Sequence, residues 1–157
     1  MITVYTDGAA RGNPGRGGFG VILMSGKHRK EIAQGYYLTT NNRIELLSVI
    51  TALEALKKEG EQVTIYSDSK YVVDAIEKKW VFGWEKKNYA GKKNPDLWMR
   101  FLRAYRKHHV NFVWVKGHAS NMFNNRCDEL ATEAADGGNL LSDTVYEELV
   151  KKGEMFD

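Results

Sequence analysis

The sequence contains one cysteine and no long apolar run. Because Cys127 has no second cysteine to pair with, an internal disulfide cannot form, and this favours a reducing compartment. No apolar stretch reaches the length of a membrane-spanning helix, and the first residues lack the basic flank and apolar core of a secretory signal. We therefore expect a cytoplasmic protein with no membrane partner.

Internal repeats, low-complexity tracts and interdomain linkers are also missing from the 157 residues. This length suits a single domain with a buried core. Its 43% hydrophobic and 27% charged residues are ordinary for a globular protein. We place the domain over residues 1–136. We expect residues 137–157 to form a partly mobile, loop-like tail with a short helix near 145–150.

Positive charge is concentrated in residues 78–93, which hold six lysines against one acid, Glu85. This segment carries +5, whereas the whole chain carries only +3. A local basic patch attracts a phosphate backbone. Four aromatic residues are interleaved with the lysines: Trp80, Phe82, Trp84 and Tyr89. The alternative is a solvated lysine face over aromatic residues of the core.

Residues 15–20 match the pattern G-x-G-x-x-G. In dinucleotide-binding enzymes these glycines close a strand and open a helix, whose N-terminus holds the pyrophosphate. Here they lead into a short apolar run rich in β-forming residues, and no helical pattern begins before Asn42. The context predicts an antiparallel hairpin and no nucleotide cofactor.

Apolar spacing predicts the elements of an α/β fold. The expected strands are residues 2–7, 19–24, 29–38, 62–67 and 110–116. The expected helices are residues 42–59, 69–79, 95–107 and 125–135. Three hairpin-linked strands, followed by two strands reached through helical crossovers, imply one mixed sheet with helices on both faces.

Four carboxylates fall at the ends of predicted elements: Asp7, Glu45, Asp68 and Asp128. Each has a purely local explanation, as a turn residue, a capping-box acid, a helix cap and a first-turn acid respectively. Taken together, they would converge at the carboxyl ends of strands, where sites form in open α/β sheets. There they would repel one another unless cations neutralised them. Ligands that are all oxygen favour Mg²⁺ or Mn²⁺ over zinc, and two ions about 4 Å apart suit phosphodiester hydrolysis.

His118 follows a glycine and opens a polar loop after the last predicted strand. A solvent-facing histidine in such a loop suits a proton carrier. Cys127 falls on the apolar face of the following helix, and we expect it to be buried and inert.

Five stretches resemble motifs of bacterial type 1 ribonuclease H: TDGAARGNPGRGGFG, TTNNRIELLSVITALEAL, YSDSKYV, DLW and WVKGHASNMFNNRCDELA. They follow that family's order and spacing over residues 2–135. The resemblance implies an endonuclease that hydrolyses the RNA strand of RNA–DNA hybrids by a two-metal-ion mechanism, leaving 5′-phosphate and 3′-hydroxyl ends. It implies a monomer with a catalytic domain over residues 1–136. The expected α/β fold is a five-stranded mixed sheet of order 3-2-1-4-5, with strand 2 antiparallel.

The resemblance also implies roles for individual residues. The catalytic residues are Asp7, Glu45, Asp68, His118 and Asp128. The four carboxylates among them bind two Mg²⁺ ions, or Mn²⁺. The hybrid is contacted in its minor groove by Asn13, Asn41 and Asn42, and a DNA-strand phosphate is held by Thr40 and Asn94. The remaining nucleic-acid contacts fall on Lys70, Trp80, Trp84, Lys86, Lys87, Lys92 and Lys93. We expect the glycines after Asp7 to let the backbone approach the minor groove closely.

The sequence departs from the family's pattern at several positions. Leu38 stands where an arginine is expected near the phosphate pocket, and Lys70 replaces a commoner glutamine. The basic segment is several residues short between Trp84 and Trp98, and Met122-Phe123 replaces a more polar turn. Two other functions stay open: a non-catalytic hybrid-binding module of the same fold, and a nuclease acting on DNA junctions.

Overall fold

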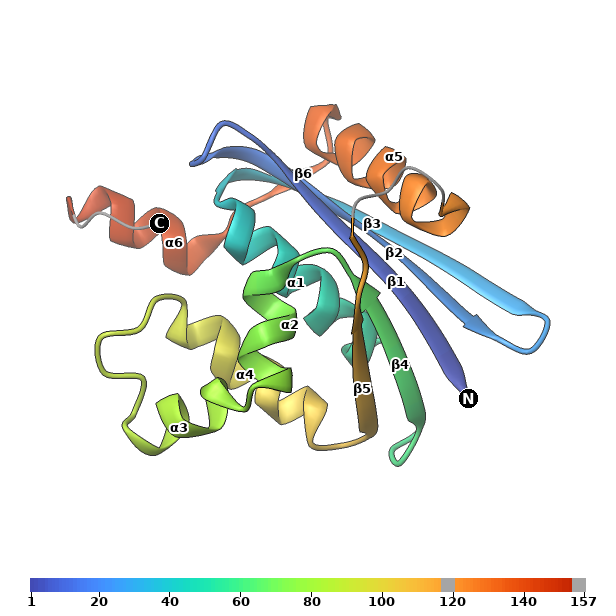
Figure 1. Cartoon of the computed structure of the whole chain (residues 1–157). Coiled ribbons are helices and arrows are strands. Elements are labelled where there is room, and N and C mark those ends of the chain that lie inside the picture. Colours follow the sequence, from blue (N-terminus) through green and yellow to red (C-terminus); the bar gives the residue numbers. More distant parts are fainter. Residues whose placement is uncertain (117–120, 154–157) are drawn as a thin grey trace.

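The computed structural model describes residues 1–116 and 121–153, which form one mixed sheet with helices on both faces (Figure 1). The strands are β1 (Ile2–Arg11), β2 (Gly15–Ser25), β3 (His28–Thr39), β4 (Gln62–Ser67), β5 (His109–Trp114) and β6 (Leu140–Leu141). Their order is β5-β4-β1-β2-β3-β6. β2 pairs antiparallel with both β1 and β3, whereas β4 runs parallel to β1 and to β5. The predicted order 3-2-1-4-5 is confirmed, and the short β6 adds a sixth strand parallel to β3.

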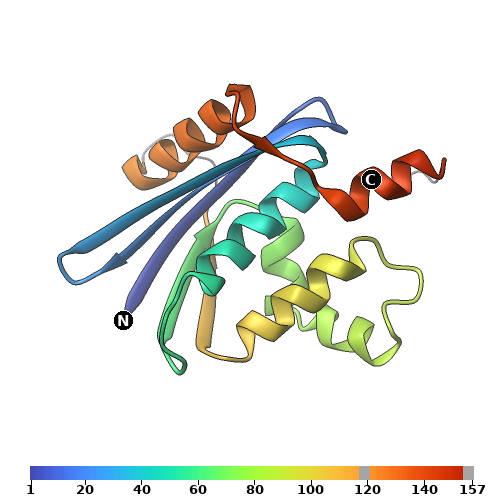
Figure 2. The same cartoon turned by 180° about the vertical axis from the view of Figure 1, so that it is seen from behind.

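The helices divide between the two faces of the sheet (Figures 1 and 2). They are α1 (Asn41–Glu54), α2 (Lys70–Glu77), α3 (Trp80–Lys86), α4 (Pro95–Tyr105), α5 (Met122–Asp136) and α6 (Thr144–Lys151). α5 packs against β1, β2 and β3 on one face, and α1 covers the opposite face with α4 packed behind it. α1 is therefore buried on most of its sides. Within residues 1–116 and 121–153, no helix is long and apolar enough to cross a membrane.

Several boundaries differ from those that the apolar pattern predicts. β1 continues four residues past Asp7, because its small residues pair with the glycines of β2 as far as Arg11, opposite Arg16. α1 ends at Glu54, well before Gly60. α3 lies within the lysine-rich segment, where no helix was predicted.

The glycines of β2 provide room for α5. A Cβ atom on Gly20 would lie 2.4 Å from the carbonyl oxygen of Cys127 and 2.6 Å from the Cβ of Leu130. A Cβ atom on Gly18 would lie 2.4 Å from the carbonyl oxygen of Ala131. These two glycines therefore serve helix packing, rather than the close approach to a minor groove that the sequence suggested. The same contact buries Cys127 completely, as predicted, and burial raises the pKa of its thiol to about 12.

Replacing Gly20 with alanine is expected to lower the free energy of unfolding by about 2 kcal/mol or more, because the added methyl group has no free space beneath α5. Urea denaturation would measure the change. The matched control is Gly83→Ala in α3, where an added Cβ has no neighbour within 4 Å. That change is expected to leave stability unaltered or raise it by about 0.5–1 kcal/mol, since alanine favours helix. Equal effects at the two positions would contradict the packing role of Gly20.

Candidate metal centre and nucleic-acid interface

Asp7 lies inside β1, the strand that pairs with β4. It is paired opposite Gly20, is only 5% exposed, and accepts a 2.9 Å hydrogen bond from the backbone N–H of Gly8. A turn residue would lie at the end of a strand. The local explanation of Asp7 is therefore wrong, because the strand continues beyond it.

Glu45 and Asp68 are not helix caps either. The N-cap of α1 is Thr40, whose hydroxyl accepts a 3.2 Å hydrogen bond from the backbone N–H of Arg43. The N-cap of α2 is Ser69, which accepts from the backbone N–H of Val72. With the capping positions filled by hydroxyl residues, both carboxylates are left for another role.

Asp128 belongs to the second turn of α5, because the helix begins three residues earlier than predicted. Its N-cap is Asn121, whose side chain accepts from the backbone N–H groups of Phe123 and Asn124 at 2.9 and 3.0 Å. The first turn contains no acid. Asp128 is solvent-exposed, but its carboxyl group interacts with that of Asp7.

Three of the carboxylates form a tight cluster. One oxygen from each of Asp7, Glu45 and Asp68 lies within 4.8 Å of the other two, although the residues come from β1, α1 and the end of β4. Asp128 lies beside this cluster, because its carboxyl group interacts with that of Asp7. We call these four residues the carboxylate site.

The electrostatics of the carboxylate site favour either protonation or a bound cation. Burial, followed by the negative charge of Asp68, raises the pKa of Asp7 to about 8, and Asp128 adds to the rise. Burial and the charges of Asp7 and Asp68 raise the pKa of Glu45 well above its usual value. The Oε1 atom of Glu45 is buried and accepts no hydrogen bond from residues 1–116 or 121–153. Clustered carboxylate oxygens of this kind fit a hard divalent cation such as Mg²⁺ or Mn²⁺.

A groove of about 530 Å³ brings together the predicted nucleic-acid contacts from both halves of the chain. It is lined by Asn13, Asn42, Tyr71, Trp80, Trp84, Gly91, Lys92 and Lys93. Trp80 is 47% exposed, with the Lys78 ammonium 5.0 Å from its ring centre. Trp84 is half-buried and packs edge-on against Trp98, with Lys92 over its ring. The two tryptophans thus differ, one facing outward and one packed inward. We call this surface the lysine–tryptophan groove.

The other predicted contacts lie around this groove. The backbone N–H of Asn41 donates to the side chain of Asn13 at 3.1 Å. Thr40 is buried, and Asn94 is 7% exposed. Three predicted lysine contacts are exposed but do not line the groove: Lys70, Lys86 and Lys87. Lys70 instead places its ammonium 4.4 Å from the ring centre of Trp114. His118 lies outside the described residues.

Sequence reasoning missed the polar network behind the groove. The hydroxyl of Tyr71 accepts hydrogen bonds from the side chains of Asn94 and Trp98, both at 3.0 Å. Arg43 is fully buried and bonded to residues more than 50 positions away. No local pattern distinguishes such an arginine from an exposed one. Met122 and Phe123, which depart from the family's pattern, form the start of α5. The ring of Phe123 stacks on that of Tyr5, with 5.0 Å between the ring centres.

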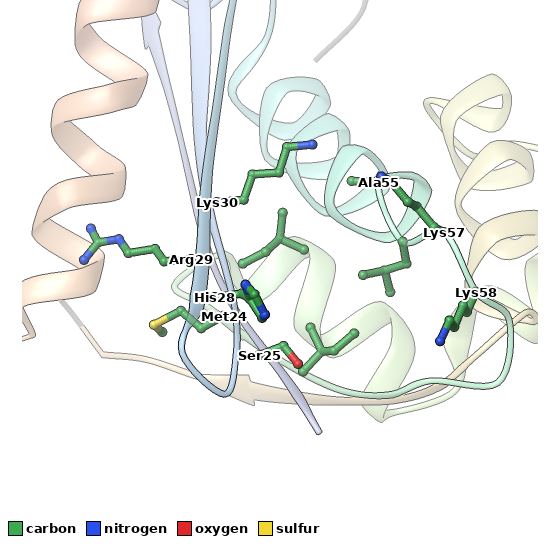
Figure 3. A pocket seen from close by; sticks show the side chains of 11 residues that line it. Met24, Ser25, His28, Arg29, Lys30, Ala55, Lys57 and Lys58 are labelled. Carbon is green, nitrogen blue, oxygen red and sulfur yellow. The ribbon is translucent and has the colours of Figure 1, made fainter.

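A larger cavity, of about 660 Å³, lies away from the carboxylate site (Figure 3). It opens between the β2–β3 hairpin and the end of α1, with apolar residues such as Ile2 and Leu23 in its lining. Basic side chains at its edge include Lys30, Lys57 and Lys58. None of the predicted site residues lines it, so size alone does not locate the chemistry of this fold.

Comparisons with known proteins agree with these observations. The sequence profile of the RNase H family matches residues 1–136. The chain is 52% identical over 151 residues to the Ribonuclease H of Syntrophus aciditrophicus, covering 93% of this chain and 87% of that protein. It is 54% identical over 157 residues to the Ribonuclease H of Lachnoclostridium phytofermentans, covering 93% and 99%.

Two solved structures extend the comparison to three dimensions. LC9-RNase H1, a type 1 RNase H with the type 2 active-site motif, is 32% identical, with a TM-score of 0.78 over 95% of this chain and 80% of that chain. LC11-RNase H1, solved in complex with an RNA/DNA hybrid, is 28% identical, with a TM-score of 0.66 over 87% and 97%.

The crowding of carboxylates predicts how metal-free stability depends on pH. The folded pKa of Asp7, about 8, exceeds its ordinary value of 3.8, so folding favours the protonated carboxyl group. The free energy of unfolding should therefore fall as pH rises from about 4 to about 8. Asp7→Asn should flatten this dependence and stabilise the metal-free protein by about 2 kcal/mol at pH 8.5. Thermal melts in a chelator, between pH 5.5 and 8.5, would measure both effects.

Asp136→Asn is the control for this experiment. Asp136 is exposed and accepts two hydrogen bonds from Arg11, at 2.9 and 2.6 Å, which lower the pKa of its carboxyl group. It stays ionised across the tested range, so its loss should leave the slope unchanged. Identical slopes in the parent and Asp7→Asn would show that Asp7 is not crowded by its neighbours.

Proposed function

The chain belongs to the RNase H family, and we propose that it is an endonuclease that hydrolyses the RNA strand of RNA–DNA hybrids, using divalent cations held by the carboxylate site. The observation that carries this function is the cluster formed by Asp7, Glu45 and Asp68. Its oxygens lie within 4.8 Å of one another in a chain that also offers a groove lined by lysine and tryptophan. LC11-RNase H1, a structural relative, was solved with an RNA/DNA hybrid.

Enzymes of this family depend on divalent metal, and the donor set here fits Mg²⁺ or Mn²⁺. Asp7, Glu45 and Asp68 would hold the cations, with Asp128 beside Asp7 as a fourth ligand. When bound, a pair of such cations supplies Lewis-acid stabilisation to the attacking and leaving oxygens of a phosphodiester. Hydrolysis in this manner leaves a 5′-phosphate and a 3′-hydroxyl.

The lysine–tryptophan groove would bind and orient the hybrid. Lys92 and Lys93 would contact phosphates by charge, and the exposed ring of Trp80 offers a flat apolar surface for a sugar. Asn13 and Asn42 present amide groups that can both donate to and accept from a 2′-hydroxyl. Contacts to the 2′-hydroxyl distinguish RNA from DNA, and would direct cleavage to the RNA strand.

Other expectations from the sequence belong to the same proposal. The catalytic unit is residues 1–136, which the family profile matches. The protein acts as a monomer in the cytoplasm, and His118 carries a proton during the reaction.

Cleavage of a labelled RNA–DNA hybrid in Mg²⁺ tests this function. Asp7→Asn and Glu45→Gln should each lower the rate by about 10³-fold or more, since each removes an anionic ligand that no neighbour replaces. Glu54→Gln, in the same helix as Glu45 but paired with Arg100 on the surface, should keep the parent's rate. If Asp7→Asn cleaved as fast as the parent, the carboxylate site would not be catalytic.

Substrate comparison separates the alternatives. We expect cleavage of the hybrid and not of duplex RNA or a DNA four-way junction of equal length. Tight hybrid binding without cleavage in Mg²⁺ or Mn²⁺ would identify a non-catalytic binding module instead. Preferential junction cleavage would identify a junction nuclease.

The lysines of the groove predict how KM depends on salt concentration. Lys92→Ala should raise KM by about three- to tenfold and reduce the slope of log KM against log salt concentration by about 1, because one phosphate contact is lost. Lys58→Ala removes the same charge at the distant cavity and should change neither quantity. Equal salt slopes for the parent and Lys92→Ala would place Lys92 outside the binding surface.

A further inference from the structure

The buried guanidinium of Arg43 joins the C-terminal segment to the groove. It donates two hydrogen bonds to Asp143, from Nε at 2.7 Å and from Nη2 at 2.8 Å. It donates two more to Asp96, at 3.0 and 2.8 Å, and one to the Oδ1 atom of Asn94, at 3.2 Å. Arg43 is 1% exposed, and the ring of Tyr146 lies 5.8 Å beneath it. Every nitrogen of the guanidinium therefore has a partner within the fold.

Asp143 reaches this position because β6 leads the chain along the edge of the sheet, beside β3. β6 pairs with β3 at Gly35 and Tyr36, and α6 follows directly, as Figure 2 shows. Asp143 is 6% exposed and also accepts a 2.8 Å hydrogen bond from the hydroxyl of Thr39. One carboxylate thus ties the end of β3 to α1, and through Arg43 to the residue that precedes α4. This carboxylate lies beyond residue 136, where the match to the family profile ends.

The network determines which way the amide of Asn94 faces. A guanidinium can only donate, so the carbonyl oxygen of Asn94 must face Arg43 and its NH₂ group must face away. One N–H of that group donates to the hydroxyl of Tyr71 at 3.0 Å. Asn94 also lines a cavity beside α6, where the other N–H could meet a phosphate oxygen.

α6 and Asn94 line this third cavity, which has a volume of about 310 Å³. Its lining includes Asn94, Tyr146 and Leu149 together with Lys92 and Lys93. The C-terminal helix therefore packs where two lysines and one amide converge.

We propose that Asp143 is a positioning residue for substrate binding: it holds Arg43 so that Asn94 presents its N–H to a phosphate of the DNA strand. This inference rests on the proposed function, because it assumes that Asn94 contacts the hybrid. Asp143 acts only through Arg43 and Asn94 and contacts no reacting atom. Its loss should therefore weaken binding and leave the chemical step unchanged.

A double-mutant cycle with Asn94 tests the proposal. Kd for a fluorescein-labelled RNA–DNA hybrid would be measured by anisotropy in Mg²⁺, in an Asp7→Asn background that prevents cleavage. Asp143→Asn should raise Kd about fivefold, as expected when one hydrogen bond to a phosphate is weakened. In an Asn94→Ala background, Asp143→Asn should not change Kd further, because the amide through which Asp143 acts is absent.

Two further variants keep the experiment decisive. Glu54→Gln also breaks a bidentate arginine–carboxylate pair between α1 and α4, but away from Asn94, and should leave Kd unchanged. Thr39→Val removes one hydrogen bond to Asp143 without changing any charge, and should give a smaller rise in Kd that Asn94→Ala again abolishes. Thermal melting of each variant sets a temperature at which all are folded, and Thr39→Val replaces Asp143→Asn if the latter does not fold.

Three results would overturn the inference: a lower melting temperature with unchanged Kd, additive effects in the Asn94→Ala background, or tighter binding by Asp143→Asn. The first would make the network purely structural. The last would mean that the charge of Asp143 opposes the phosphate. If the parent with Asp7 intact bound the hybrid but did not cleave it, the proposed function would fail, while the binding cycle would still decide the role of Asp143.

Discussion

The parallel pairing of β1 with β4 determines where the chemistry of this protein lies. Tyr5 is aligned with Tyr66, so the two strands continue side by side toward Asp7 and Asp68. Glu45 enters from α1, which packs on β1 and β2. The fold therefore brings like charges together in a partly desolvated environment, where their mutual repulsion is stronger than in water. The hydrophobic core must offset this cost whenever no cation is bound.

The environment of the site differs from that of an ordinary surface ion cluster. Burial is the largest cause of the raised pKa of both Asp7 and Glu45, with charge repulsion second. A carboxylate that is buried and crowded gains more from a cation than an exposed one does. Asp128, which lies on the exposed side, completes an arrangement that is closed on the protein side and open toward solvent.

Much of this architecture could be predicted from the sequence, because the predicted elements have strong local patterns. The five longer strands alternate or form apolar runs, and the four carboxylates fall at the ends of the elements as the sequence predicts them, so the cluster followed from topology. For single residues, however, the local sequence pattern predicted the wrong helix caps. The caps of α1 and α2 are the hydroxyl residues Thr40 and Ser69, which lie two residues before Asn42 and one residue after Asp68, the caps that the pattern suggested. The family resemblance, rather than periodicity, supplied the individual hybrid contacts.

The missed features have a common physical cause, which is that they depend on partners far along the chain. β6 has two residues and exists only through its pairing with β3. α3 begins after Lys79, which has a left-handed conformation with φ of 62°, and lies in the lysine-rich segment, where no helix was predicted. Arg43 and Asp143 are 100 positions apart, and neither has a neighbour in sequence that would mark it as buried.

The separation of Arg43 from Asp143 has a consequence for how the protein is made. During synthesis, α1 emerges about a hundred residues before the carboxylate that completes the shell of its arginine. Of the described residues that bond to this guanidinium, Asp96 and Asn94 emerge earlier than Asp143, and the edge of β3 stays open until β6 covers part of it. Domains fold as units as the chain grows, and an exposed edge invites pairing with other chains. β6 and Asp143 thus join elements that were made about a hundred residues earlier, and they do so behind the lysine–tryptophan groove.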